Sequence, residues 1–316
     1  MSFKKIKLSH ISLKALELGH IYKYPIYYKK DDGIYTKLIQ KDTMFNTDIQ
    51  KQIENLNIID VFVKYEDHDK YEKDTQNYLK KIINDKNVPT SLKSEILHEM
   101  AADVINDLLN GELSAKKIDQ ASDIVSDTVG LILSDKTTIK AMLKVTSHDY
   151  YTYTHSVNVS TYALGFGEYL NLSEENLKVI GMAGVMHDVG KRKIPSEIIN
   201  KNGKLTNEEF YLMKSHPTFG VEILKELGET NQLLLDIVEQ HHEKIDGSGY
   251  PKGLKKNDIH IIAQIMSIAD IFDALTTKRS YKDAMKSFEA FNIMHNHMKK
   301  ELNPKLLRKF MDFMSK

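Results

Sequence analysis

Cysteine is absent from this 316-residue chain. Without thiols the protein has no disulfides, no thiolate metal sites, no iron–sulfur clusters and no cysteine nucleophile. An excess of one charge is also lacking, because Lys and Arg together number 44 and so do Asp and Glu. No apolar run approaches the roughly 18 residues of a membrane span. Composition therefore favours neither a nucleic-acid polymer nor a membrane as the partner.

The start of the chain gives no sign of export. Met1 to Lys7 carries basic residues, but no apolar region follows them as it would in a signal peptide. Hydrophobic residues make up 41% of the chain and charged residues 28%, values typical of globular proteins that bury a core. We therefore expect a cytoplasmic protein without a membrane span.

The first 68 residues are predicted to form a small α+β unit. Aromatic and β-branched residues indicate strands at 21–28, 34–40 and 58–63, a turn at 31–33 and a helix at 47–55. No cluster of ionisable side chains lies in this part of the sequence. A sensory, regulatory or assembly role is therefore more consistent with residues 1–68 than catalysis.

The rest of the chain is predicted to be helical, so the fold class is mainly α. Apolar residues recur every three or four positions through residues 69–144, which favours a helical linker or bundle. Pro89 and the Asn110-Gly111 pair should end helices there. Residues 145–316 are predicted to be a separate helical domain, in which Thr206 and Glu209 have the spacing of a capping box.

Two apolar segments carry acidic side chains that need partners. Residues 179–186 are almost wholly apolar and lead directly into His187 and Asp188; Asp270 and Asp273 lie within the apolar run 259–274. Burying an unpaired carboxylate costs several kcal/mol. Ion pairs with Lys191 and Arg279 are the ordinary explanation, and a metal cation is the alternative.

Histidines add to this pattern. His241 and His242 are adjacent, so on a helix their side chains should point about 100° apart and reach a metal from two sides. His155 lies where an amphipathic helix is expected to begin, and His216 lies in the segment Met213-Lys214-Ser215-His216-Pro217. Taken singly, each histidine is more often an ordinary core or surface residue. Taken together, imidazoles and carboxylates without thiolates are typical ligands of first-row transition metals.

The order and spacing of these residues resemble the HD-GYP family of metal-dependent phosphodiesterases. The signature His-His-Glu-x-x-Asp-Gly-x-Gly-Tyr-Pro is matched at 241–251, and His-Asp-x-Gly-Lys at 187–191. A further family block is matched at 270–276, followed by Arg279 and Tyr281. The resemblance covers about residues 145–316.

The resemblance implies an all-helical HD-type bundle that holds two divalent ions, with iron or manganese expected. It assigns His155, His187, Asp188 and Asp270 to one ion, and His216, His241 and His242 to the second, with Asp188 shared. Some family members carry a glutamate for a third ion where this chain has Tyr151, so we expect two ions.

The resemblance also implies an activity in bacterial second-messenger signalling. The family hydrolyses cyclic di-GMP to pGpG through a hydroxide activated by two metals, and cleavage onward to GMP is left open. Asp188 and Lys191 would be catalytic, and Lys191, Arg279 and Lys282 would contact substrate. Gln264 and Ser280 depart from residues common in the family.

The loop that gives the family its name is expected to border the pocket and to be a docking point for a protein partner. Its residues in this chain are Asp246, Gly247, Gly249, Tyr250 and Pro251. A homodimer is a further candidate assembly.

Two alternatives to cyclic di-GMP hydrolysis stay open at this point. One is a cyclic-dinucleotide receptor or adaptor with little turnover. The other is a phosphodiesterase for a different dinucleotide such as cyclic GMP-AMP, because no motif in the sequence encodes the purine pocket.

Overall fold

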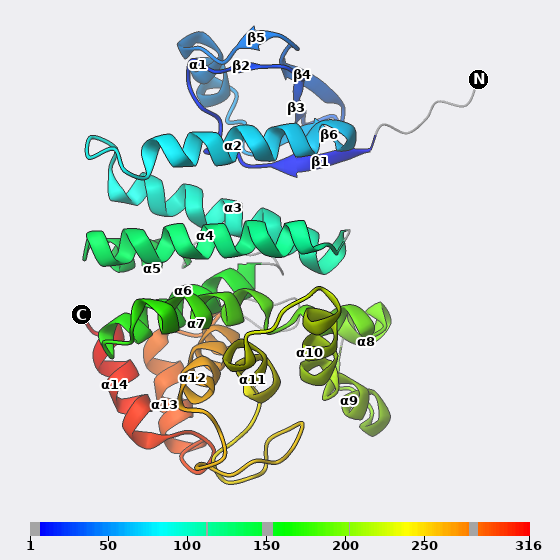
Figure 1. The fold of residues 1–316 in the computed structure, drawn as a ribbon. Helices are drawn as coiled ribbons and strands as arrows, with labels where there is room; N and C mark the ends of the chain where they lie inside the picture. Colours follow the sequence, from blue (N-terminus) through cyan, green and yellow to red (C-terminus); the bar gives the residue numbers. More distant parts are fainter. Residues whose placement is uncertain (1–6, 112, 147–153, 202, 278–283) are drawn as a thin grey trace. The chain divides into compact units, whose positions relative to one another are not determined.

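The chain forms two compact units. The structure, a computed structural model, describes residues 7–111, 113–146, 154–201, 203–277 and 284–316 (Figure 1). The first unit spans Met1–Asp103 and the second Val104–Lys316, with the division inside helix α3 (Thr90–Asn110). The division at 103/104 separates compact units and does not test where the three predicted segments meet, so the boundaries at 68/69 and 144/145 stay predictions.

The first unit contains an antiparallel sheet with the strand order β1-β6-β3-β4, and a separate pair formed by β2 and β5. Helix α1 and a short 3-10 turn, η1, precede helix α2. The bounds are β1 Leu8–Ile11, β2 Ile21–Tyr22, β3 Ile26–Lys29, β4 Tyr35–Ile39, β5 Thr43–Met44, α1 Thr47–Asn55, β6 Val61–Lys64, η1 Tyr65–Asp67 and α2 His68–Ile82.

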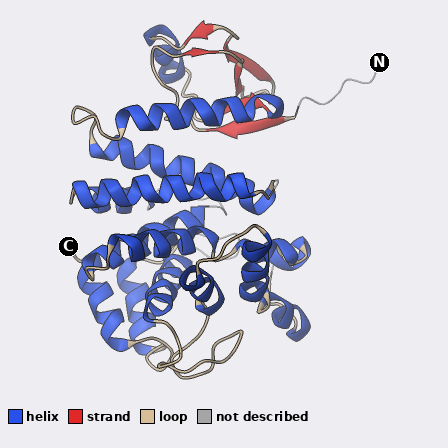
Figure 2. Cartoon of the chain, in the orientation of Figure 1, coloured by secondary structure: helices blue, strands red, loops and turns tan. Residues whose placement is uncertain are grey.

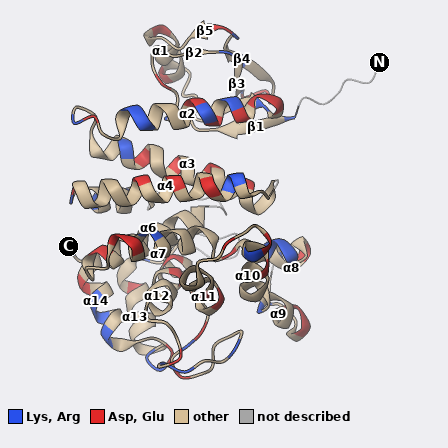
Figure 3. Ribbon diagram, in the orientation of Figure 1, with Lys and Arg blue, Asp and Glu red and all other residues tan. Residues whose placement is uncertain are grey.

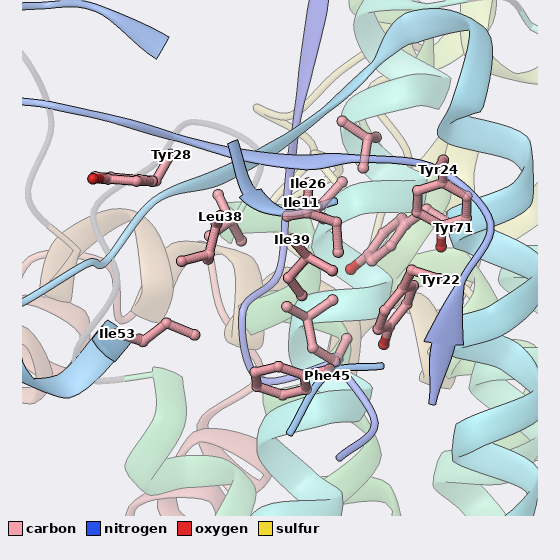
Figure 4. Close-up of a cluster of buried hydrophobic side chains, with 14 of the residues drawn as sticks. Ile11, Tyr22, Tyr24, Ile26, Tyr28, Leu38, Ile39, Phe45, Ile53 and Tyr71 are labelled. Atoms are coloured by element: carbon pink, nitrogen blue, oxygen red, sulfur yellow. The ribbon is translucent and has the colours of Figure 1, made fainter. Parts of the chain in front are cut away.

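Tyrosine and isoleucine side chains form the core of this unit. The cluster joins residues of the strands to Tyr71 of α2, and Figure 4 shows Tyr22, Tyr24 and Tyr71 close together at one side of it. The Tyr71 hydroxyl accepts a hydrogen bond from the Ser12 backbone N–H at 3.0 Å. Helix α2 is thereby fixed to the sheet of its own unit.

The second unit is helical throughout its described elements (Figure 2). Its helices are α4 Ala115–Ser134, α5 Thr138–Thr146, α6 Thr154–Tyr169, α7 Glu174–Met186, α8 Ser196–Ile199, α9 Asn207–Met213, α10 His216–Glu226, α11 Gln232–Gln240, α12 Ile261–Thr276, α13 Ser287–Asn296 and α14 Pro304–Met314, with the 3-10 turn η2 at Val189–Lys193. The predicted mainly α class is confirmed.

Helices α6, α7 and α12 form the centre of this unit. Most residues of α6 are buried, and so is every residue of α7 from Val179 to Met186, as expected for helical segments that are surrounded by protein. A Cβ on Gly184 would lie 2.5 Å from the Ser160 Cα, so α6 and α7 touch backbone to backbone there. Helix α4 also packs on α7, since a Cβ on Gly181 would lie 2.8 Å from the Val125 side chain.

The surfaces carry charges of both signs. Acidic and basic side chains are interspersed along α2, and α4 has basic side chains at its start and acidic ones beyond them (Figure 3). Within the described residues, every helix is too short or too polar to cross a membrane.

Candidate metal centre

The first two residues of the candidate site lie at the end of helix α7. His187 caps the helix and Asp188 follows as it turns into η2; their exposed fractions are 1% and 5%. Because α6 touches α7 closely, the His155 ring of α6 lies 5.2 Å from the His187 ring, measured between centroids. An apolar helix pair thus brings ligand-type groups together in the interior.

Asp188 lies between two groups of histidines. Its Oδ2 faces the first group, at 3.8 Å from His155 Nε2 and 3.4 Å from His187 Nε2. Its Oδ1 faces the second group, at 3.4 Å from His216 Nε2. The two oxygens of one carboxylate therefore point toward different donor sets.

Helix α12 supplies two buried carboxylates that hold the same imidazole. His155 Nε2 lies 3.1 Å from Asp270 Oδ1, and His155 Nδ1 lies 2.6 Å from Asp273 Oδ2. The predicted need for a positive partner opposite Asp270 and Asp273 is met in the structure by His155. Arg279, the expected ion-pair partner, lies outside the described residues.

His216, His241 and His242 form the second group. His216 Nε2 and His241 Nε2 are 3.2 Å apart, and the His241 and His242 ring centroids are 4.1 Å apart. The prediction that both adjacent histidines lie on a helix was wrong. Helix α11 ends at Gln240, so His241 is its cap and His242 lies in the turn beyond, where the two rings come side by side.

Backbone carbonyls fix the orientation of three of the imidazoles. The Nδ1 atoms of His187, His216 and His241 lie within hydrogen-bond distance of the carbonyls of Gly184, Met213 and Val238 at 2.8, 2.8 and 2.6 Å. A carbonyl only accepts, so each Nδ1 carries the hydrogen and each Nε2 presents a lone pair to the centre. This is the arrangement that metal-binding histidines use.

The pKa shifts leave the two donor sets differently charged. Burial lowers the pKa of His216 to about 4 and that of His242 to about 3, and it holds the pKa of His241 well below its ordinary value. Neutral imidazole is the form that binds metals. Burial also disfavours the charged form of His155, but hydrogen bonds to Asp270 and Asp273 outweigh burial and raise its pKa to about 9.

The carboxylates stay ionised although they are buried. Burial alone would raise the pKa of Asp188, but Lys191 and His187 outweigh it and hold that pKa well below the ordinary value. The Lys191 ammonium donates to Asp188 Oδ2 at 2.6 Å. Burial is likewise outweighed at Asp270, where the hydrogen bond from His155 and the charges of His242 and His155 lower the pKa.

These residues fit transition-metal ions. There are two sets of donor atoms, and within each set the atoms lie within 4.8 Å of one another. One set is made of His155, His187 and Asp188, and the other of His216, His241 and His242. His187 Nε2 and Asp188 Oδ1 are buried without a hydrogen-bond partner, although buried polar atoms are nearly always paired. Cations held by these two sets would supply the missing partner of each atom.

The loop at 246–251 closes one side of the centre. Glu243, only 4% exposed, accepts hydrogen bonds from the backbone N–H groups of Lys252 at 2.7 Å and Leu254 at 2.9 Å. Gly249 lies so close to the preceding turn that a Cβ would sit 2.6 Å from the His242 carbonyl oxygen. This places the Tyr250 ring 4.7 Å from the His242 ring. The remaining residues of the loop have local roles. Gly247 has a positive φ, and the Asp246 carboxylate accepts a hydrogen bond from the Ser248 hydroxyl. Pro251 directly follows Tyr250.

Some predicted residues have other roles or lie outside the described residues. Arg279, Lys282, Ser280 and Tyr151 are in the latter group. Gln264 donates to the carbonyls of Lys256 and Ile259 at 3.1 and 3.0 Å and accepts from Asn303 at 2.9 Å, so its described contacts are with the protein's own backbone and core.

Sequence reasoning missed the roles of Asp273 and Glu243. Both positions were within recognised motifs, but nothing in the sequence showed which groups they would contact. A carboxylate on a buried helix face three residues from Asp270 was the available signal for Asp273.

Comparison with known proteins places the chain in a family. The family model described as HD domain matches residues 119–306. A cyclic di-GMP phosphodiesterase of Pseudomonas aeruginosa is 36% identical over 174 residues, which are 55% of this chain and 42% of that protein. A 3'3'-cGAMP-specific phosphodiesterase of Vibrio cholerae is 44% identical over 130 residues, 41% of this chain and 25% of that protein.

The fold has a match over nearly its whole length. An HDGYP protein of Bdellovibrio bacteriovorus superposes with a TM-score of 0.74 at 18% identity, covering 98% of this chain and 100% of that one. The chain belongs to the HD domain family. It spans less than half the length of the two curated relatives.

Proposed function

We propose that this protein is a metal-dependent phosphodiesterase that hydrolyses cyclic di-GMP to pGpG. The observation that carries the proposal is the pair of buried donor sets joined by the two oxygens of Asp188. The similarity to a cyclic di-GMP phosphodiesterase supports the choice of substrate.

The residues divide into two groups of ligands. His155, His187, Asp188 and Asp270 would hold one divalent ion, and His216, His241 and His242 the second, with Asp188 shared. Iron or manganese suits this imidazole and carboxylate set. Two such ions lower the pKa of water and polarise phosphoryl oxygens at neutral pH.

The protein's own groups would orient the substrate and balance its charge. The Lys191 side chain is 30% exposed and its ammonium lies beside Asp188, so it is placed to approach a non-bridging phosphate oxygen. An ammonium there would stabilise negative charge that develops as the diester is cleaved. Arg279 and Lys282 are proposed as further phosphate contacts.

A second dinucleotide is also a candidate substrate. The 44% identical relative from Vibrio cholerae is named as specific for 3'3'-cGAMP. Competition between cyclic di-GMP and cyclic GMP-AMP for the purified protein would rank the two.

Product analysis and metal quantification on one sample test the proposal. Wild-type protein loaded with iron or manganese should release pGpG, whereas Asp188→Ala should bind less metal and lose at least about 1000-fold in kcat, since one change disrupts both donor sets. Asp123→Ala, on the exposed side of α4, is the matched control and should keep wild-type activity. Intact cyclic di-GMP after incubation with metal-loaded wild-type protein would refute the proposal; binding without turnover would instead indicate a receptor.

A further inference from the structure

Lys214 lies at the rim of the second donor set. It occupies the short turn between α9 and α10, two residues before His216. Its ammonium is 4.7 Å from the centre of the Phe210 ring and 5.6 Å from the centre of the Tyr250 ring. Tyr250 in turn lies against His242, so the chain of contacts leads from Lys214 directly to the metal ligands.

In the part of the chain that the structure describes, no carboxylate pairs with the ammonium of Lys214. Other lysines around the site form ion pairs with carboxylates; these are Lys191, Lys193, Lys201, Lys244 and Lys252. Among the described residues, no carboxylate lies within 4.0 Å of Lys214, and its close partners are aromatic rings. Such contacts orient the ammonium without cancelling its charge.

The Phe210 ring beside this ammonium is exposed, and a second exposed aromatic residue, Tyr211, follows it on the same helix. Phe210 is 47% exposed and Tyr211 is 78% exposed, both on α9. An oriented ammonium next to open aromatic faces matches the chemistry of a nucleotide, whose phosphate attracts a cation and whose base stacks on rings. A cyclic dinucleotide has two phosphodiester groups, and only one of them can be at the metal ligands at a time.

We infer that Lys214, oriented by Phe210 and Tyr250, is a second phosphate subsite that binds the phosphodiester of a cyclic dinucleotide that is not being cleaved. The inference rests on the proposed function for its substrate class. It adds a residue that no sequence motif indicated and that acts on substrate affinity and specificity.

Steady-state kinetics of Lys214→Met on two substrates test the inference. For cyclic di-GMP, kcat/KM should fall about 10-fold or more, mainly through KM, as expected for the loss of one charge-assisted contact. Bis(p-nitrophenyl) phosphate has a single phosphodiester, so its hydrolysis should fall by a much smaller factor. Lys214→Arg should recover most of the loss, and Lys225→Met, an exposed lysine at the far end of α10, is the matched control.

Equal losses on both substrates would show that Lys214 acts on the metal centre, and no loss on either would leave it without a role. Each of these results overturns the inference.

Equilibrium binding of cyclic di-GMP distinguishes failure of this inference from failure of the proposed function. If wild-type protein binds the dinucleotide without cleaving it and Lys214→Met binds about 10-fold more weakly, the function is wrong and the subsite stands. If wild-type protein does not bind it, both fail. Thermal unfolding of each variant checks that the fold is kept.

Discussion

At the scale of single residues, the centre shows how one carboxylate can orient an imidazole. His155 differs from His187, His216 and His241 because its Nδ1 faces a carboxylate, Asp273, and not a backbone carbonyl. Asp273 is fully buried and is itself held by the Thr277 hydroxyl, which donates to its other oxygen at 2.9 Å. The Asp273 carboxylate thus fixes the His155 ring with Nε2 toward Asp270 and Asp188.

Replacing Asp273 with asparagine should weaken metal binding at the His155 side of the centre. Loss of such an outer partner typically lowers metal affinity by about 10- to 100-fold. Titration of the metal-free protein with manganese, followed by the signal of free Mn²⁺ in electron paramagnetic resonance, measures this. Asp312→Asn on the exposed side of α14 is the control. Unchanged affinity in a folded Asp273→Asn protein would contradict the role.

The stability of chelator-treated protein should depend on pH through His155. Its pKa is raised from 6.5 to about 9 in the folded state, so its contribution is fully present below pH 6.5 and is lost as pH rises through 9. By linkage, up to about 3 kcal/mol is involved. The pKa of His216 is lowered to about 4, so stability should also fall as pH drops below 6.5.

Melting temperatures from pH 4 to 10, taken in the presence of a chelator, measure this dependence. The wild-type curve should have its maximum near neutrality, and the alkaline decline should be reduced in His155→Gln. A flat curve between pH 6.5 and 9.5 in both proteins would argue against it.

At the scale of elements, the sequence predicted those features that depend on local signals. Helix α1 was predicted at its observed bounds, and Asn46 caps it by accepting from the backbone N–H groups of Asp48 and Ile49. The Thr206 and Glu209 capping box is present with both of its hydrogen bonds. Strand β1 was missed because it is short and partly polar, and it forms by pairing with β6, whose residues lie at least 50 positions away.

The sequence indicated which residues gather in the candidate site, but not which side chains they contact there. The motifs identified the histidines and carboxylates because their types and spacing are local properties of the sequence. They did not indicate that His155 lies between Asp270 and Asp273, because α6 and α12 are brought together by packing. The aromatic neighbours of Lys214 likewise depend on where the 246–251 loop folds back.

The close contact between η2 and α10 depends on a single glycine. A Cβ on Gly190 would lie 1.9 Å from the His216 carbonyl oxygen and 2.4 Å from the Gly220 N. Gly190→Ala should therefore push η2 away from α10, separate Asp188 from His216, and cost about 1–3 kcal/mol of unfolding free energy. Urea denaturation and metal content measure the two effects.

Gly130→Ala is the matched control for that variant. Gly130 is an exposed residue of α4 whose added Cβ would meet nothing within 4 Å, so alanine should stabilise the helix by about 0.5–1 kcal/mol. If Gly190→Ala were as stable as wild type and held the same amount of metal, the close contact would not be needed.

At the scale of the whole molecule, helix packing indicates where the unit that carries the two donor sets begins. The predicted boundary at 144/145 would leave out α4, yet α4 packs on α7 and the family match begins at residue 119. Arg192 of η2 also donates to the carbonyls of Leu108 and Gly111 at 2.7 and 3.0 Å. These contacts favour an independent unit that starts near residue 104.

Two shortened proteins distinguish these boundaries. Residues 104–316 should fold cooperatively and bind metal as the full chain does, because the α4 face of α7 stays covered and Arg192 keeps both acceptors. Residues 145–316 should be destabilised by several kcal/mol, since the buried apolar side chains that α4 contributes, Ile124, Val125, Val129 and Ile132, would be lost from the core. Thermal unfolding and manganese binding of both proteins, with the full chain as reference, measure the difference. Cooperative unfolding with full metal binding by residues 145–316 would show that the boundary at 144/145 is correct and that α4 is only a linker.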